Sequence, residues 1–212
     1  MTPAFTDERP LRLGVLISGG GSTLANLAAR LADGRLARVR IGLVISSRAA
    51  VRGVDVARVA GLPLAVLRPR DYGDEAAYGA ALAAACDGAG VDLAVMGGFL
   101  CLWRYPPHYA GRILNIHPAL LPGFGGPGMF GHQVHAAVLA AGATESGCTV
   151  HIVDEQYDHG PIVAQKRVPV APDDTAETLA ARVQAAEREL YPQVLQRVAD
   201  EGLAWLRRAG GR

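Results

Sequence analysis

The segment LRLGVLISGGGSTLANL (residues 11–27) runs from an apolar stretch through a glycine-rich turn into a helical pattern. Leu11–Ile17 has the length and hydrophobicity of a buried strand, and apolar residues then recur at helical spacing up to Leu31. Free backbone N–H groups at a helix start favour anions, so this unit predicts a phosphate site. Its glycine spacing matches neither the dinucleotide fingerprint nor the P-loop. A tight turn without a ligand is the alternative.

The same strand–helix rhythm continues along the chain. Apolar strands are expected at 41–45, 64–67, 91–96 and 112–116, and helices at 51–60 and 74–86. Two further strands, 147–153 and 161–170, are joined by a short polar connection, which predicts an antiparallel pair. The expected fold class is therefore α/β, a doubly wound and mostly parallel sheet with an antiparallel C-terminal component.

Composition limits the classes of function. Half of the 212 residues are hydrophobic, 19% are charged and the net charge is +1, so no basic field for nucleic acid or a membrane surface is expected. The three cysteines form neither a zinc pattern nor a disulfide framework. We expect a polar, flexible tail at 1–10, a single domain over 11–206, a cytoplasmic location, and a monomer or homodimer.

The strand at 112–116 leads into the most reactive part of the sequence, Asn115-Ile116-His117-Pro118. Residues two apart on a strand share a face, so Asn115 and His117 are expected to project together from its carboxyl end. An amide donor beside an imidazole can stabilise an oxyanion and move a proton. Two satisfied polar groups at a strand end are the alternative.

Two loops flank this strand. The apolar loop 97–103 fits a slot for a flat ring, although a buried loop is equally compatible. The glycine-rich loop 123–131 is too irregular for a helix or strand and is expected to be functional. His132 and His135 begin a helix over 132–141, but no third metal ligand follows at a fixed spacing, so no metal is expected.

The C-terminal part ends in a long helix. Asp174-Thr175-Ala176-Glu177 predicts a capping box with Asp174 as the cap. The helix is expected over 175–207, with Pro192 kinking or breaking it.

Five short motifs in this order resemble the phosphoribosylglycinamide formyltransferases, a folate-dependent family of purine synthesis. The resemblance covers roughly residues 11 to 206. The motifs are Ser18-Gly19-Gly20-Gly21-Ser22, Gly98-Phe99, Asn115-Ile116-His117-Pro118-Ala119-Leu120-Leu121-Pro122, Gly147-Cys148-Thr149-Val150-His151 and Asp158-His159-Gly160-Pro161-Ile162.

The resemblance implies transfer of a formyl group from 10-formyltetrahydrofolate, a co-substrate, to the amine of phosphoribosylglycinamide, without a metal. By motif match, Asn115 would donate to the oxyanion of the tetrahedral intermediate. His117 would stabilise it and assist proton transfer, and Asp158 would pair with His117. The binding residues implied are Gly21, Ser22 and Thr23 for the substrate phosphate, Gln184 and Glu187 for the ribose and glycinamide, and Leu100, Cys101, Leu102 and Trp103 for the folate.

The sequence departs from the family pattern at several positions. Cys101 stands where many relatives carry Arg, and the helix near Glu75 lacks a basic residue that some relatives place near the folate glutamate. Thr23 replaces a frequent Asn, and the loop 123–131 is longer than in many relatives. Folate affinity is the property that these departures put in question.

Three alternatives share parts of the pattern. Formyltetrahydrofolate hydrolase has the same Asn, His and Asp set but normally an added N-terminal domain. Methionyl-tRNA formyltransferase normally has a further C-terminal domain and a basic surface. A non-catalytic nucleotide-binding module on the same sheet would not need Asn115, His117 and Asp158 together.

Overall fold

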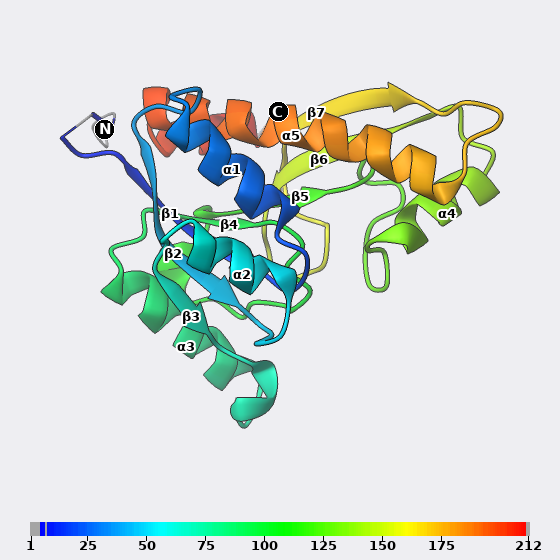
Figure 1. The fold of residues 1–212 in the computed structure, drawn as a ribbon. Coiled ribbons are helices and arrows are strands. Elements are labelled where there is room, and N and C mark those ends of the chain that lie inside the picture. Colours follow the sequence, from blue (N-terminus) through cyan, green and yellow to red (C-terminus); the bar gives the residue numbers. More distant parts are fainter. Residues whose placement is uncertain (1–4, 7, 211–212) are drawn as a thin grey trace.

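A seven-stranded sheet in the order β3-β2-β1-β4-β5-β6-β7 forms the centre of the computed structural model (Figure 1). The structure describes residues 5–6 and 8–210. The strands are β1 (Leu11–Ile17), β2 (Val39–Ser46), β3 (Leu64–Val66), β4 (Leu93–Met96), β5 (Ile113–His117), β6 (Glu145–Ile152) and β7 (Ile162–Pro169). The first five are parallel, while β6 pairs antiparallel with β5 and β7 antiparallel with β6. The predicted fold class is confirmed.

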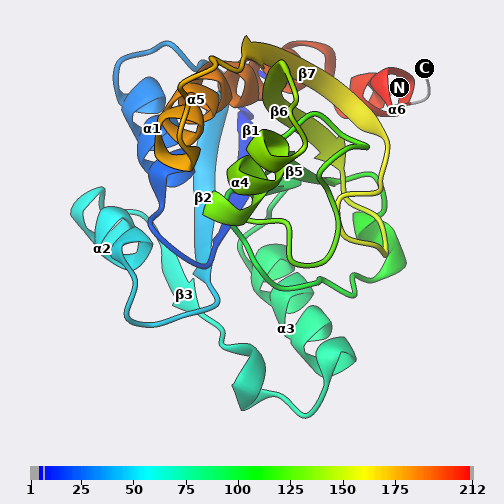
Figure 2. The same cartoon turned by 90° about the vertical axis from the view of Figure 1, so that its right-hand side faces the viewer.

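Helices cover both faces of this sheet. They are α1 (Ser22–Ala32), α2 (Arg52–Val59), α3 (Glu75–Gly88), α4 (His132–Ala140), α5 (Ala176–Glu201) and α6 (Ala204–Ala209), with 3₁₀ turns at Pro69–Asp71 and Pro107–Tyr109. Alternation along β1 explains the two layers. Leu13 and Val15 pack in the cluster that includes α1 and α5, whereas Leu16 packs in the cluster with α3. Figure 2 shows α1 beside α5 on one side and α3 on the other.

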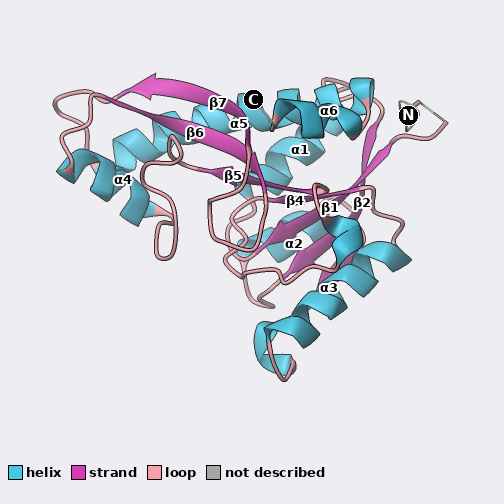
Figure 3. Ribbon diagram, turned by 180° about the vertical axis from the view of Figure 1, so that it is seen from behind, coloured by secondary structure: helices cyan, strands magenta, loops and turns pink. Residues whose placement is uncertain are grey.

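The antiparallel strands extend the sheet away from its parallel half. Figures 1 and 3 show β6 and β7 running past β5 toward α4. The ladder places His151 opposite Asn115 and Thr149 opposite His117. This part of the fold therefore adds side chains from β6, and from the loop that follows it, to the carboxyl end of β5.

Two predictions about the last helix were wrong. Thr175, not Asp174, is the N-cap of α5, and its side chain forms a capping box with Thr178. Asp174 instead accepts hydrogen bonds from Ala171 N and from the Arg182 guanidinium. The helix also ends at Glu201 and not at 207, before Gly202 with φ 79°, and it is not broken at Pro192. Gly202 ends the helix because it adopts a backbone conformation that glycine tolerates.

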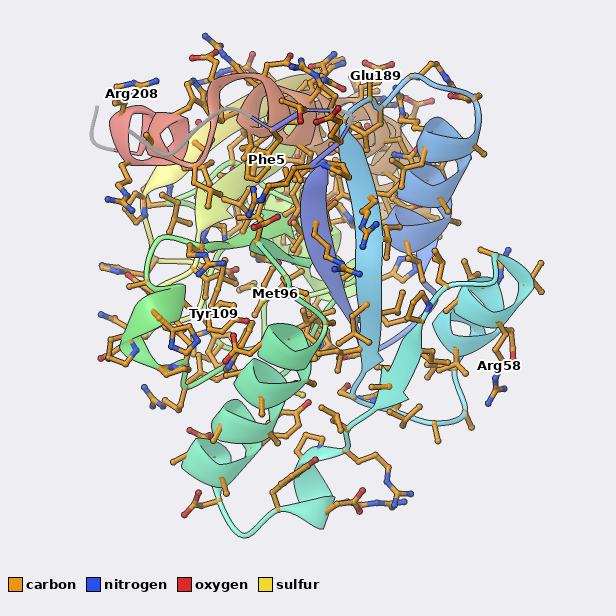
Figure 4. All side chains as sticks on the ribbon, turned by 90° about the vertical axis from the view of Figure 1, so that its left-hand side faces the viewer. Phe5, Arg58, Met96, Tyr109, Glu189 and Arg208 are labelled. Carbon is orange, nitrogen blue, oxygen red and sulfur yellow. The ribbon has the colours of Figure 1, made fainter. Side chains whose placement is uncertain are left out.

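The predicted tail at 1–10 lies partly outside the described residues. Within the described part, Phe5 (labelled in Figure 4) is 1% exposed and belongs to the main core cluster. Arg9 forms an ion pair with Asp92, with 2.9 Å between Nη2 and Oδ1. These two residues pack on the domain because the Phe5 ring has apolar partners there.

Among the described residues, no helix has the length and hydrophobicity needed to cross a membrane.

Candidate active site

One cavity of about 490 Å³ lies at the carboxyl ends of β1, β4 and β5. Every residue predicted from the sequence as a site residue lines it: Gly21, Ser22, Thr23, Leu100, Cys101, Leu102, Trp103, Asn115, His117, Asp158, Gln184 and Glu187. The fold thus brings together segments more than 160 residues apart in the chain. Their individual roles remain predictions.

The glycine turn before α1 forms one wall of the cavity. Gly21 is the N-cap of α1 and has φ 70° and ψ 25°, a left-handed conformation that favours glycine. No described side chain caps this helix start, so its first N–H groups are open to a ligand. Ser18, which is fully buried, links this turn to the apolar loop after β4, because its hydroxyl accepts from Leu100 N at 2.9 Å.

His117 is the centre of the polar cluster. It is 3% exposed, and its Nδ1 lies 3.3 Å from Asp158 Oδ2. Its Nε2 lies 2.8 Å from the carbonyl oxygen of Phe124, at the start of the glycine-rich loop. Both partners are oxygens that only accept, so a ring carrying both protons donates to both. The expectation that Asp158 pairs with His117 agrees with this geometry.

Asp158 is held by several contacts in an uncommon backbone conformation, φ 53°. Its Oδ2 accepts from Gly126 N at 3.1 Å, and its Oδ1 lies 3.4 Å from Asn115 Nδ2. Burial alone would raise the pKa of Asp158, but the His117 and His151 rings and the Gly126 N–H outweigh it and lower the pKa well below its usual value. The carboxylate is therefore ionised at neutral pH.

His151 is a further member of the cluster that sequence reasoning did not assign to the site. Its Nε2 lies 3.1 Å from Asn115 Nδ2 and 3.6 Å from Asp158 Oδ1, and its Nδ1 lies 3.1 Å from the Ile152 carbonyl oxygen. The alternating pattern of its strand was visible in the sequence. The register that sets His151 against Asn115 was not, because it arises from the pairing of two distant strands.

The apolar wall is formed by the loop after β4. Leu100 is 38% exposed at the opening, whereas Trp103 is 1% exposed. The Trp103 indole N–H donates to Gly79 O at 3.0 Å, and its ring packs 5.1 Å from that of Tyr109. Trp103 is therefore buried behind the apolar wall of the cavity, while the Leu100 side chain is accessible to a ligand.

Helix α5 supplies the wall facing the polar cluster. Gln184 is exposed into the cavity and Glu187 is half-buried. Burial raises the pKa of Glu187 to about 7, against the opposing charges of His117 and Arg188. Helix α4 lies beside α5, and His132 and His135 also line the cavity. Within the described ranges, no three His, Cys, Asp or Glu side chains are grouped closely enough to hold a metal ion.

Comparison with known proteins agrees with this geometry. The formyl transferase family model matches residues 11–195. The Escherichia coli (strain K12) phosphoribosylglycinamide formyltransferase is 35% identical over 200 residues, which are 91% of this chain and 92% of that protein. The crystal structure of glycinamide ribonucleotide transformylase 1 from Symbiobacterium toebii superposes with a TM-score of 0.83 at 39% identity, covering 90% of this chain and 88% of that one.

A bovine relative contains a similar sequence within a longer protein. The chain is 40% identical over 190 residues to the trifunctional purine biosynthetic protein adenosine-3 of Bos taurus and spans 18% of its length. The chain belongs to the formyl transferase family. The resemblance to phosphoribosylglycinamide formyltransferases is confirmed by relatives and solved structures of that name.

Proposed function

We propose that the protein transfers the formyl group of 10-formyltetrahydrofolate to the amine of phosphoribosylglycinamide in purine (IMP) biosynthesis. One observation carries the proposal. The Asn115, His117 and Asp158 cluster lies in a single cavity between an open helix start at Gly21 and the apolar slot at Leu100. That arrangement suits a phosphorylated amine on one side and a flat folate ring on the other.

The chemistry follows from the cluster. The amine nitrogen attacks the formyl carbon, a C–N bond forms, and the formyl oxygen becomes an oxyanion. His117 and Asn115 donate to this oxyanion, and each such donor is worth roughly 3 kcal/mol of transition-state stabilisation. The C–N bond to the folate then breaks, and the proton lost by the amine returns to the folate nitrogen through His117.

The His117 ring is held by contacts at both of its nitrogens. Its Nε2 contacts the Phe124 carbonyl oxygen, so a substrate oxygen must take the place of that carbonyl to receive the same hydrogen bond. Asp158 holds the other nitrogen, with 3.3 Å between His117 Nδ1 and Asp158 Oδ2. In this scheme Asp158 orients His117 and stabilises its charge, while His117 moves the proton.

The binding residues are proposed from the same cavity. The phosphate would bind Gly21, Ser22 and Thr23, and the folate would lie against residues 100–103. Gln184 and Glu187 would face the ribose and glycinamide. The open helix start and the exposed Leu100 surface support these assignments.

A cytoplasmic location, and a monomer or homodimer, are retained as predictions. The three cysteines are free thiols, which supports a reducing compartment.

The deciding experiment offers the purified protein 10-formyltetrahydrofolate with and without phosphoribosylglycinamide and follows the deformylated folate. Release that requires the ribonucleotide supports the transferase. Release without it would identify a hydrolase, and no release would leave a binding module.

A further inference from the structure

His135 is a buried polar side chain that the proposed chemistry does not use. It lies on α4, is 3% exposed, and lines the cavity. Its Nδ1 is enclosed and has no hydrogen-bond partner within the described part of the chain. Because Nδ1 is enclosed, only the other ring nitrogen, Nε2, can reach a ligand in the cavity that His135 lines.

The protonation of His135 follows from its surroundings. Burial, and then the charges of His132 and His117, lower the pKa of His135, so the ring is neutral at neutral pH. A neutral ring has one N–H and one lone pair. An enclosed lone pair is tolerated more readily than an enclosed N–H, which assigns the lone pair to Nδ1 and the proton to Nε2. Nε2 is then a donor available to a ligand.

A second group of donors lies beside the ring. Gly131 is the N-cap of α4, no described side chain caps this helix, and its first turn has no acidic residue. Its first backbone N–H groups therefore also lack side-chain partners. His135 is in this first part of the helix, so the ring and the helix start present donors to the same end of the cavity.

The chemistry of these donors selects their ligand. A dianionic phosphate would favour a charged imidazole, whereas burial keeps the His135 ring neutral at neutral pH. A carbonyl oxygen has two lone pairs and can accept from both the ring and the helix start. His117 and His135 line the same cavity, so this subsite lies in the cavity where the amine would react. The glycinamide carbonyl is separated from that amine by one carbon.

We propose that His135, together with the uncapped first turn of α4, receives the glycinamide carbonyl oxygen and so orients the amine toward the formyl carbon. The inference rests on the proposed function, because it names a contact to the same substrate. His135 acts as a substrate-positioning residue and takes no part in proton transfer.

The test compares His135→Leu, which removes the donor, with His135→Gln, which retains an N–H. Calorimetry should give a dissociation constant for phosphoribosylglycinamide about tenfold higher in His135→Leu, as expected for one lost hydrogen bond, and within about threefold of wild type in His135→Gln. The inhibition constant for inorganic phosphate should stay unchanged in both. Gln133→Leu, at an exposed position of the same helix, is the control.

A substrate analogue makes the test independent of how well the variants fold. The thioamide of the ribonucleotide has a weaker acceptor, so wild type should bind it several-fold more weakly than the amide. His135→Leu should show no such preference, since the contact is already lost. Equal wild-type affinity for amide and thioamide would overturn the proposal, as would an equal loss of ribonucleotide and phosphate affinity in His135→Leu.

The two proposals fail in different ways. If wild type binds the ribonucleotide and His135→Leu binds it equally well, only the carbonyl subsite is wrong. If wild type does not bind the ribonucleotide at all, the proposed function falls and the subsite with it.

Discussion

The contacts of His117 and Asp158 agree with the roles proposed for these two residues. The His117 ring has an acceptor oxygen at each nitrogen and is therefore held in one orientation. The Asp158 carboxylate contacts Nδ1, and the Phe124 carbonyl oxygen contacts Nε2. Asp158 keeps its position because Gly126 N and the neighbouring rings contact it from different directions. The uncommon φ of Asp158 is compatible with these contacts and costs of order 1 kcal/mol.

Replacing Asp158 by Asn should lower turnover by roughly 10²- to 10⁴-fold, because the amide has no charge to stabilise the His117 cation. Steady-state assays with both substrates saturating measure this effect. His159→Ala is the matched control, since His159 pairs with Asp154 at 2.7 Å and its side chain is 62% exposed. Turnover near that of wild type in Asp158→Asn would remove Asp158 from the mechanism.

Replacing His117 by Ala should lower turnover by at least 10²-fold and change ribonucleotide affinity much less, because the lost donor acts in the transition state. Turnover and binding are measured separately, by single-turnover kinetics and calorimetry. A higher dissociation constant at unchanged turnover would contradict the oxyanion role.

At the level of elements, the glycine turn and α1 are positioned by α2. Gly53 N donates to Gly19 O at 3.0 Å. A Cβ on Gly53 would lie 2.5 Å from Ile17 Cδ1 and 2.8 Å from Gly19 O. Contacts this short cannot be accommodated without moving the turn, so α2 sets the shape of the proposed phosphate site.

Replacing Gly53 by Ala should therefore displace the turn, cost about 1–3 kcal/mol of stability, and weaken inhibition by inorganic phosphate. In wild type, phosphate should compete with the ribonucleotide. Urea unfolding and inhibition assays give the two quantities. Val59→Ala is the control on the same helix, because Val59 is 91% exposed. Unchanged phosphate inhibition in a destabilised Gly53→Ala protein would mean that phosphate binds elsewhere.

At the scale of the whole molecule, the order of the strands in the sheet determines where the site residues meet. Parallel β1, β4 and β5 end at one edge, and the antiparallel β6 brings His151 and the Asp158 loop back to it. Helix α5 is tied to the sheet by the buried Tyr191, whose hydroxyl donates to Leu114 O at 3.0 Å. Glu187, one turn before Tyr191, is held toward the cavity by this arrangement.

The stability of the whole fold should depend on pH through Glu187. Its pKa is about 7 in the folded protein and near 4.5 when unfolded, so the folded state binds more protons between these values. The contribution of Glu187 to the free energy of unfolding should then fall as pH rises from about 4.5 to 7, by roughly 1–3 kcal/mol. Asp158, with its lowered pKa, contributes in the opposite sense at lower pH.

Urea unfolding at pH 5 and pH 8 tests this expectation. Glu187→Gln should gain stability relative to wild type at pH 8 but not at pH 5. The exposed Glu189 has a lowered pKa, so Glu189→Gln should show no such change within this window. The same pH dependence in wild type and Glu187→Gln would mean that Glu187 is ionised in the folded protein over this range.

Local patterns predicted much of the fold but not the ends of its elements. Strand β1 was predicted from a continuous apolar run, which requires no distant partner. The cap at Thr175 and the unbroken passage through Pro192 were missed, because the side-chain partners of Asp174 and the packing of α5 on the sheet decide them. Phe5 was missed for the same reason, since its core partners are distant in the chain.

The sequence alone predicted the fold class from its strand–helix pattern, and it predicted Asn115 and His117 as a pair from their spacing on one strand. Asp158 was predicted through the resemblance to the family motif. Only the tertiary structure decided that His151 faces Asn115, that Phe124 O contacts His117, and that His135 Nδ1 is enclosed without a hydrogen-bond partner among the described residues. Each of these contacts joins separate elements or a folded loop. Strand register and helix packing, which no local pattern encodes, set their distances.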